Sequence, residues 1–417
     1  MMICEGCRIA IWGTGYYAKK FYLLEHKNFE VVCFYDNDKK RWGQELYGIP
    51  VKQWDNDKNV KIIIASSYWE EILKGLLEDG LRLLYDIIPF QFLHSRNISY
   101  RVIDNLRREG VDVLQLLQEL KGSRKIAVIY GNCQTAMLGE ILLINSSFAD
   151  KYYFVIIPSV FEYNSGVEWR DLWDKLLEHA EFWRQVDLFL CQNVSVSNKF
   201  CPKLATDNIV KKLSSTCKII RIVNIFFDGY FVQRINNNNN FMKEIQQSGL
   251  FPFGDIFVNE LLKKGISIKD ILKLIKDENF FTPEFIEYAV RQSLAELSER
   301  EKEVDVVISD YIESKCRETQ LFYSPNHPVN TVLIEYARRI IRYMGLDDEE
   351  IHEDIVSLKV GCLKGQDIPI YPAVIKQLGL KEYDNRYYNN RYIEPDFLFD
   401  FDEYIRKYIF YCFPIKT

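Results

Sequence analysis

The stretch Ile126-Ala127-Val128-Ile129-Tyr130-Gly131-Asn132-Cys133-Gln134-Thr135 decides the fold of the larger part of this chain. Its first five residues form an apolar run that is too short for a lone helix and is typical of a buried parallel strand. Gly131 and Asn132 tolerate the tight turn that ends such a strand, and residues 136–143 have the apolar spacing of a helix. The pattern therefore predicts a strand-to-helix turn that places Cys133 at the carboxyl edge of a sheet, where α/β proteins keep their active sites.

A cysteine at such a turn has a specific chemical use. The N-terminus of the following helix lowers the pKa of a thiol, and its backbone N–H groups can hold an oxyanion. The alternative is that Cys133 is a small residue packed in a turn. We favour the chemical interpretation, because the geometry suits a nucleophile and a partner histidine occurs later in the chain.

Composition narrows the class of protein. The chain has 417 residues, of which 48% are hydrophobic and 27% charged, so we expect a globular protein of two or three domains. A net charge of -6 argues against a nucleic-acid partner, and no apolar run is long enough for an integral membrane protein. The first eight residues lack the apolar core of a signal peptide, and ten irregularly spaced cysteines fit the reducing cytoplasm. Cys4-x-x-Cys7 has no second pair, so we expect no metal site.

The first 95 residues resemble a small Rossmann-like module. An apolar strand at residues 8–12 leads directly into Gly13-x-Gly15-x-x-Ala18, and a second strand ends at Asp36. Small residues at these positions let the backbone approach a pyrophosphate, and an acid at this distance can bind a ribose hydroxyl.

Two interpretations of this module stay open. Its Tyr35–Asp38 and Gly48–Val51 segments resemble those of the modules found at the ends of sugar-modifying enzymes. Gly13, Gly15, Ala18 and Asp36 would then bind a nucleotide or nucleotide sugar, or the fold would serve only as a docking scaffold.

The rest of the chain predicts a second α/β domain. Residues 96–123 are charged and helical in pattern, and we interpret them as a linker. From residue 124 onward, strands alternate with helices, which implies a parallel sheet, and the segment up to residue 417 ends in helices. The predicted fold class is therefore α/β, with two Rossmann-like parallel-sheet domains at 1–95 and 124–417 and a helical C-terminal extension on the second.

One of the five histidines is placed for catalysis. His327 lies in a loop between Pro325 and Pro328, just before a predicted helix, and the prolines fix the backbone around it. A general base needs such a fixed position, although a histidine that caps a turn would look the same. Asn193 lies just beyond a middle strand. Together, Cys133, Asn193 and His327 suggest a nucleophile, an oxyanion donor and a base, in that order.

The order of these residues is similar to that in the SGNH hydrolases, so the second domain is predicted to be SGNH-like. Gly131-Asn132-Cys133 takes the place of that family's Gly-Asp-Ser, with cysteine for serine. The family's Asp three residues before the histidine is replaced by Ser324. The group that orients His327 is therefore left among Asn326, Asp228 and Asp255.

Five motifs in the same order make residues 124–380 resemble the WcbI family of capsular-polysaccharide biosynthesis enzymes. They are Tyr130-Gly131-Asn132-Cys133-Gln134, Asn224 with Asp228-Gly229-Tyr230, Gly254-Asp255, Asn326-His327-Pro328 and Ile368-Pro369-Ile370-Tyr371-Pro372. The resemblance implies an acetyl-CoA-dependent O-acetyltransferase that acts on a sugar in capsular or surface polysaccharide biosynthesis. Cys133 and His327 carry over as its reactive residues, with Asn132 and Gln134 beside the nucleophile.

In this hypothesis the backbone N–H groups of Cys133 and Gln134 and the Asn193 side chain hold the oxyanion. Arg221 and Arg234 are candidate contacts for the phosphates of coenzyme A. The expected partner is a sugar or polysaccharide precursor, and a homo-oligomer is allowed. Two alternatives remain: a carbohydrate esterase or deacetylase that uses the same residues, and a non-catalytic scaffold that binds a nucleotide sugar.

Overall fold

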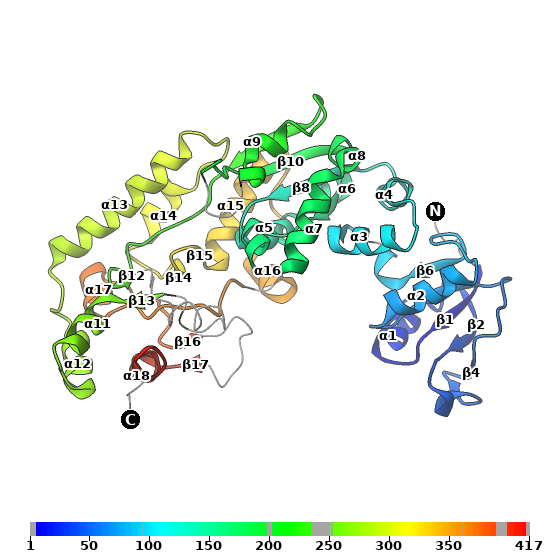
Figure 1. Cartoon of the computed structure of the whole chain (residues 1–417), viewed down its shortest axis with the longest axis horizontal. Coiled ribbons are helices and arrows are strands. Elements are labelled where there is room, and N and C mark those ends of the chain that lie inside the picture. Colours follow the sequence, from blue (N-terminus) through cyan, green and yellow to red (C-terminus); the bar gives the residue numbers. More distant parts are fainter. Residues whose placement is uncertain are drawn as a thin grey trace. The chain divides into compact units, whose positions relative to one another are not determined.

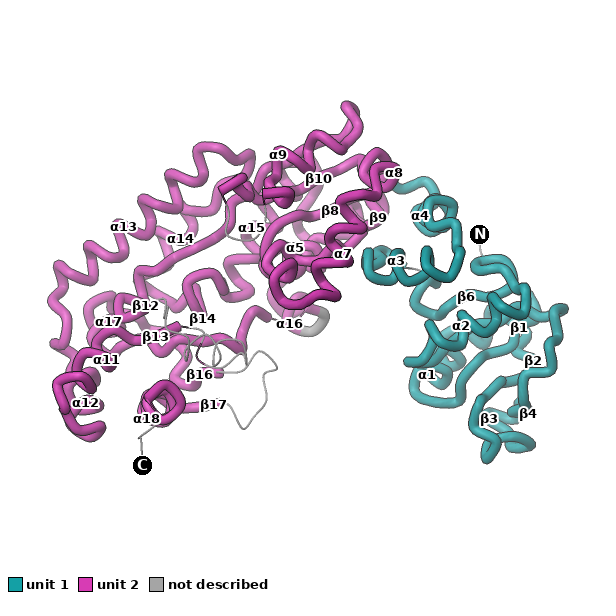
Figure 2. Tube along the Cα trace, viewed as in Figure 1, with its two compact units in different colours: residues 1–124 teal, residues 125–417 magenta. Residues whose placement is uncertain are grey.

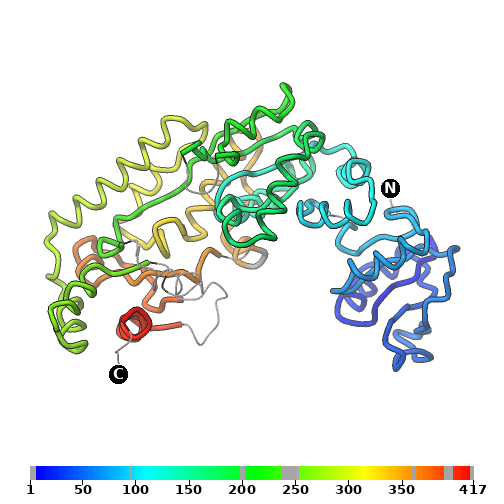
Figure 3. The backbone as a smooth tube through the Cα atoms, in the orientation of Figure 1, coloured from blue at the N-terminus to red at the C-terminus, as the bar shows by residue number. Residues whose placement is uncertain are grey.

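The computed structural model describes residues 6–93, 95–197, 202–235, 251, 253–360, 362–388 and 398–413. The chain divides into two compact units, residues 1–124 and residues 125–417 (Figure 2). Figure 3 follows the backbone through both units. Cys4 of the Cys4-x-x-Cys7 pair lies outside the described residues.

The first unit is built on a six-stranded sheet of order β3-β4-β2-β1-β5-β6, in which only β3 runs antiparallel to its neighbour. The strands of this unit are β1 (Arg8–Trp12), β2 (Glu30–Tyr35), β3 (Glu45–Leu46), β4 (Ile49–Lys52), β5 (Lys61–Ile64), β6 (Ile87–Pro89) and β7 (Asn97–Ser99). Its helices are α1 (Tyr16–Glu25), α2 (Trp69–Glu78), α3 (Tyr100–Arg108) and α4 (Val113–Lys121). Ile9 and Ile11 of β1 pack with Ala18 and Phe21 of α1 in a fully buried core, because alternate strand residues share one face.

The second unit contains four neighbouring parallel strands in the order β11-β10-β8-β9. These are β8 (Lys125–Tyr130), β9 (Tyr152–Ile156), β10 (Val186–Gln192) and β11 (Lys218–Ile222). The helices between them are α5 (Cys133–Leu142), α6 (Ser146–Lys151), α7 (Val167–Glu178), α8 (Ala180–Arg184) and α9 (Thr206–Val210).

Both faces of this sheet are buried, which explains why its strands are almost continuously apolar. On one face, Ile129 of β8 belongs to the same core cluster as Leu138 of α5. On the other face, the Tyr130 ring meets the Trp173 ring of α7 edge-on, with centroids 6.0 Å apart. Packing on both faces of the sheet therefore holds the end of β8, and with it the turn to α5, in place.

The chain beyond β11 is mainly helical (Figure 1). Its helices are α11 (Ile256–Lys263), α12 (Ile268–Ile275), α13 (Pro283–Glu301), α14 (Ser309–Lys315), α15 (Asn330–Tyr343), α16 (Glu353–Lys359), α17 (Pro372–Leu378) and α18 (Phe401–Cys412). The described part of this region also contains short two-stranded antiparallel sheets. They pair β12 (Arg234–Ile235) with β13 (Gly254–Asp255), β14 (Phe322–Ser324) with β15 (His327–Pro328), and β16 (Tyr387–Tyr388) with β17 (Leu398–Phe399). Within the described ranges, no helix is long and apolar enough to cross a membrane.

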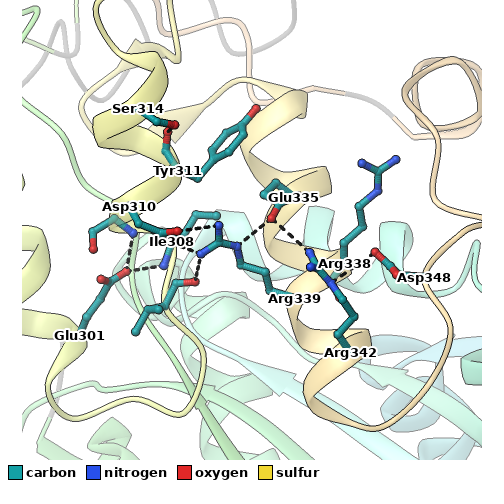
Figure 4. Close-up of polar contacts among 12 residues, drawn as sticks. Glu301, Ile308, Asp310, Tyr311, Ser314, Glu335, Arg338, Arg339, Arg342 and Asp348 are labelled. Carbon is teal, nitrogen blue, oxygen red and sulfur yellow. Dashed lines mark hydrogen bonds and ion pairs between the residues drawn. The ribbon is translucent and has the colours of Figure 1, made fainter.

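A chain of ion pairs ties α15 to the segment before it (Figure 4). Arg339 of α15 donates to both carboxylate oxygens of Asp310 on α14 and to Glu335 one turn earlier on its own helix. Arg342 shares Glu335 at 3.2 Å and reaches Asp348 at 3.5 Å. Because α15 begins three residues after His327, this network also anchors the chain that carries the histidine.

The predicted fold class is confirmed: the protein is α/β, with two parallel sheets and a helical C-terminal region. The strands predicted at residues 8–12 and 126–130 are observed as β1 and β8, with bounds that differ by at most one residue. Residues 83–88 are also mostly apolar, but β6 begins only at Ile87. The positive φ of 66° at Leu84 belongs to a turn, and its N–H donates to the Ile87 carbonyl at 2.7 Å.

Gly13 provides a test of the packing in the first unit. It has φ +115°, and a Cβ at this position would lie 2.7 Å from the Ala65 carbonyl oxygen of β5's end. We expect Gly13→Ala to lower the free energy of unfolding of this unit by about 1–3 kcal/mol, because backbone atoms cannot move aside cheaply. Chemical denaturation measures this change. The matched control is Gly15→Ala, where a Cβ meets nothing within 4 Å, and an equal effect of the two substitutions would contradict the prediction.

Candidate active site

The turn between β8 and α5 holds Cys133 at the first position of the helix. Asn132 is the N-cap, and its Oδ1 accepts a hydrogen bond from the Gln134 backbone N–H at 3.0 Å. Gly131 precedes it, and any Cβ there would clash with the Gln192 side chain. Only glycine therefore lets β10 come this close to the turn.

Gln134 is fully buried and joins four segments of the second unit. Its Nε2 donates to the Ile225 carbonyl at 2.6 Å and to the Asn326 carbonyl at 2.8 Å. Its Oε1 accepts from the Ile225 N–H at 3.1 Å and from Gln192 Nε2 at 3.3 Å. The amide thus uses all four of its hydrogen-bonding positions, and it links α5 to β10, to the segment after β11 and to the loop before His327.

A backbone N–H group fixes the orientation of two further side-chain amides. Because Asn132 Oδ1 accepts from the Gln134 N–H, its Nδ2 must be the donor to Asn224, at 2.7 Å. The Asn224 atom facing Asn132 is then Oδ1, and its Nδ2 points elsewhere. Among the described residues, Asn224 Nδ2 makes no hydrogen bond. Asn224 therefore offers a free N–H donor beside the Cys133 turn.

His327 lies on the hairpin formed by β14 and β15, whose tip is Pro325-Asn326. Two hydrogen bonds hold this tip: the Phe227 N–H donates to the Pro325 carbonyl at 2.8 Å, and Gln134 donates to the Asn326 carbonyl. The second bond connects the neighbour of Cys133 to the neighbour of His327. The two predicted reactive residues therefore lie on adjoining loops, and no hydrogen bond joins their side chains in the described part of the chain.

Burial keeps both reactive groups neutral. Burial raises the pKa of the Cys133 thiol to about 12, although the Cys133 and Gln134 backbone N–H groups oppose the shift. Burial alone lowers the pKa of His327 to about 4. At neutral pH the site therefore holds a thiol and an imidazole that can accept a proton, and not a preformed thiolate-imidazolium pair.

Asn193, the oxyanion donor predicted from the sequence, makes its side-chain hydrogen bond to a residue outside this turn. Its side chain is exposed and donates to Glu303 Oε2 at 2.9 Å. The preceding residue, Gln192, is buried and accepts from the Asn132 N–H at 2.9 Å through its side chain. Sequence reasoning missed Gln192, and it quoted Asn224 in a motif without assigning it to the site.

The cationic residues near the site differ in their pairing. The Arg221 carbonyl accepts a hydrogen bond from the Asp305 N–H, and the Arg221 N–H donates to the Asp305 carboxylate. Arg221 lies within β11 and is half-buried. Arg234 forms a two-pronged ion pair with Asp228. Arg300, which the sequence did not single out, donates to the Phe226 carbonyl at 3.0 Å and forms no ion pair within the described residues.

Arg234 and Arg300 share an aromatic neighbour. Their guanidinium carbons lie 5.7 and 5.6 Å from the centre of the Phe226 ring, within the range of a cation–π contact. Phe226 lies two residues beyond Asn224. Both guanidinium groups thus lie against a side chain that is two residues from Asn224 in the chain.

The Gly254-Asp255 motif and the Ile368–Pro372 motif contact each other. Asp255 accepts hydrogen bonds from the Tyr371 hydroxyl at 2.7 Å and from the Val258 N–H at 2.9 Å. Burial raises the pKa of Asp255 to about 6. The Ile368 N–H donates to the Tyr323 carbonyl at 2.9 Å. Asp255 and Asp228 are thus each engaged with another residue, so neither carboxylate orients His327 in this structure.

In the first unit, the fingerprint residues contact one another. Gly13 packs against Ala65 at the end of β5, and Ala18 of α1 is fully buried. Asp36 accepts from the Thr14 hydroxyl through one carboxylate oxygen and from the Asp38 N–H through the other. Gly15 is the N-cap of α1 and makes no side-chain cap. Nucleotide binding at these residues stays a prediction.

Comparison with known proteins agrees with the geometry. The family model described as "Polysaccharide biosynthesis enzyme WcbI" matches residues 126–349, and the model "C2185-like, N-terminal" matches residues 6–82. A solved structure of native WcbI, described as a polysaccharide biosynthesis enzyme without a disulfide bond between coenzyme A and one of its cysteines, is 20% identical. Its TM-score is 0.57, and the match covers 69% of this chain and 89% of that chain. None of the curated proteins compared with this chain matches it.

Fold and site together define an α/β protein with a cysteine at a helix N-terminus and a histidine on an adjoining hairpin. The chain belongs to the WcbI family of polysaccharide biosynthesis enzymes, and it carries a C2185-like N-terminal domain. The family predicted from the five motifs is thereby confirmed.

Gln134 provides a stability test of the site. We expect Gln134→Ala to lower the free energy of unfolding of the second unit by about 3–5 kcal/mol, because the Ile225 and Asn326 groups lose buried partners. Chemical denaturation followed by tryptophan fluorescence measures the change. Gln292→Ala on the exposed side of α13 is the matched control. A loss as small as that of the control would show that the four hydrogen bonds do not hold the site together.

Proposed function

We propose that the second unit is an acetyl-CoA-dependent O-acetyltransferase whose acceptor is a sugar hydroxyl on a surface-polysaccharide precursor. The observation that carries the proposal is the Gln134 link between the Cys133 turn and the His327 loop. The family name supports a role in polysaccharide synthesis, and the related WcbI structure is described with coenzyme A and a cysteine. The eight described cysteines are free thiols, which suits a reaction in the reducing cytoplasm.

In the first step, Cys133 Sγ attacks the thioester carbonyl of acetyl-CoA while His327 takes the thiol proton. The bond between the acetyl carbon and the sulfur of coenzyme A breaks, and the leaving thiolate takes the proton from His327. In the second step, the sugar hydroxyl attacks the acetyl-cysteine, and its proton passes through His327 to the Cys133 sulfur. Because the resting thiol and imidazole are both neutral, the proton must move in concert with the attack.

The oxyanion needs donors that are not already used. The Gln134 N–H is engaged by Asn132 Oδ1, and the Asn193 amide donates to Glu303. Asn224 Nδ2 is free among the described residues, and the Cys133 N–H lies at the N-terminus of α5. We therefore assign the oxyanion to the Cys133 N–H and Asn224 Nδ2, with Asn193 as the rival from the sequence.

The phosphates of the acyl donor require cations. Arg300 is half-buried and lacks an ion-pair partner in the part of the chain described, and Arg234 lies against the same Phe226 ring. A guanidinium group forms two parallel hydrogen bonds to a phosphate. These two residues fit the anionic end of coenzyme A better than Arg221, whose place is within β11.

Cys133 is tested by substitution. We expect Cys133→Ala to abolish sugar-dependent release of coenzyme A from acetyl-CoA, because the acetyl group then has no attachment site. Thiol release with a panel of sugars measures this, and mass spectrometry of the wild-type protein should show the acetylated cysteine. Cys217→Ala, a partly buried thiol on another loop, is the control. Full activity of Cys133→Ala would exclude the covalent route, and release without any sugar would favour an esterase.

The state of His327 predicts the pH dependence of transfer. Since burial lowers the pKa of His327 to about 4, the imidazole is neutral and competent above that value and is protonated below it. We expect kcat/KM for acetyl-CoA to be flat from about pH 5 to pH 8 and to fall near pH 4, as a general base requires. A midpoint near pH 6.5, the ordinary value for histidine, would contradict a buried base.

Asn224 and Asn193 make opposing predictions for the oxyanion donor. We expect Asn224→Ala to lower kcat by about a hundredfold to a thousandfold with little change in KM, as loss of one oxyanion donor does. Steady-state kinetics of Asn224→Ala and Asn193→Ala, measured side by side, decides between them. A large loss for Asn193→Ala alone would overturn our assignment and restore the donor expected from the sequence.

A further inference from the structure

Ser324 and His327 are directly opposed across the hairpin of β14 and β15. The register pairs Ser324 with His327, and only Pro325 and Asn326 lie between them. Residues opposed in an antiparallel pair point to the same face, with Cβ atoms about 4.5–5.5 Å apart. Ser324 Oγ is one bond from its Cβ, and His327 Nδ1 is two bonds from its own. The two polar atoms can therefore meet directly or across one water.

Both atoms are buried and have no hydrogen-bond partner among the described residues. Ser324 is fully buried, and its Oγ makes no hydrogen bond to the described part of the chain. His327 Nδ1 is buried and likewise unpartnered there, although the residue as a whole is only half-buried. Leaving a buried polar atom without a hydrogen bond is unfavourable, so we expect two such atoms on facing residues to bond to each other, directly or through a water.

We propose that Ser324 is the positioning residue of His327, with its hydroxyl accepting a hydrogen bond from Nδ1–H so that Nε2 faces the substrate as the base. The role of Nε2 rests on the acyl transfer proposed above. The hydrogen bond itself does not, because it concerns the tautomer of the free protein. In a neutral imidazole only one nitrogen carries a proton, so a partner at Nδ1 fixes the lone pair at Nε2.

The surroundings exclude the other groups that could orient the ring. Asp228 is paired with Arg234, and Asp255 accepts from Tyr371. Asp367 accepts from the Gly365 and Tyr388 N–H groups. Burial lowers the pKa of His327, and no charged group among the described residues shifts it further.

A hydroxyl has a consequence that a carboxylate would not have. A carboxylate at position 324 would stabilise the imidazolium and raise the pKa of His327. The uncharged serine orients the ring without this effect, so the base stays neutral down to acidic pH. The proposed contact would thus fix the tautomer while leaving the imidazole neutral at rest.

The test is nitrogen NMR of the full-length protein labelled at histidine, without substrate, with His327→Gln to assign the signal. We expect wild-type His327 to be the Nδ1–H tautomer, and Ser324→Ala to shift the population toward Nε2–H. Ser324→Thr, which keeps the hydroxyl, should restore the wild-type tautomer, and Ser298→Ala on exposed α13 should leave it unchanged. A wild-type His327 that is mainly Nε2–H would overturn the proposal, even if every variant failed to fold.

Kinetics adds an independent readout. We expect Ser324→Ala to lower kcat about tenfold, the factor that corresponds to one hydrogen bond, with KM unchanged. Ser324→Asp should raise the pKa of His327 by about one to three units and move the acidic limb of the pH profile upward by the same amount. An unmoved limb in a folded Ser324→Asp protein would count against the contact. If acyl transfer fails and the tautomer result holds, Ser324 still positions His327 and only the proposed function is lost.

Discussion

One buried side-chain amide joins the Cys133 turn to the His327 hairpin in this protein. Gln134 has no exposed surface and bonds to groups from three other segments. The Gln134 amide donates one hydrogen bond to the Ile225 carbonyl and accepts one from the Ile225 N–H. A neighbouring backbone strand would make the same two hydrogen bonds. A buried amide must satisfy its polar atoms, because each unmet group carries a desolvation cost. The loops can therefore satisfy Gln134 only in the arrangement that brings the Cys133 turn and the His327 hairpin together.

The electrostatic character of the site follows from the same burial. Uncharged amides contact Asn132 beside Cys133, and no carboxylate among the described residues shifts the pKa of His327. Among those residues, only the backbone N–H groups of Cys133 and Gln134 offset part of the cost of creating charge on the thiol. A charge-separated pair would need a stabilising neighbour to persist in such surroundings. The proposed acyl transfer suits such a site, because its charge would appear only transiently on an acyl oxygen. In that proposal the N-terminus of α5 and the Asn224 amide would hold this oxygen without a charged side chain.

Sequence patterns predicted the parts that depend on local physics. Apolar runs gave the strands of both sheets, a small-residue turn gave the position of Cys133, and flanking prolines gave the fixed loop of His327. The contacts among side chains could not be predicted, because they depend on which loops adjoin. Asn193 and Gln192 show the reason. Successive residues at the end of a strand face opposite ways, so a shift of one position separates an amide on the site from one on the surface.

The helical C-terminal region contacts the segments that carry the candidate site, although it follows the sheet in the chain. The WcbI family model matches residues 126–349, and Ile368–Pro372 lies beyond that match. Ile368 nevertheless bonds to Tyr323, which precedes Ser324, and Tyr371 bonds to Asp255 beside Arg234. Ile368 thus bonds to strand β14 of the His327 hairpin, while Gln134 bonds to the tip of the hairpin at Asn326. A histidine whose loop is held at two points needs little reordering to take a proton, and this rigidity would suit the proposed base, which contacts no carboxylate among the described residues.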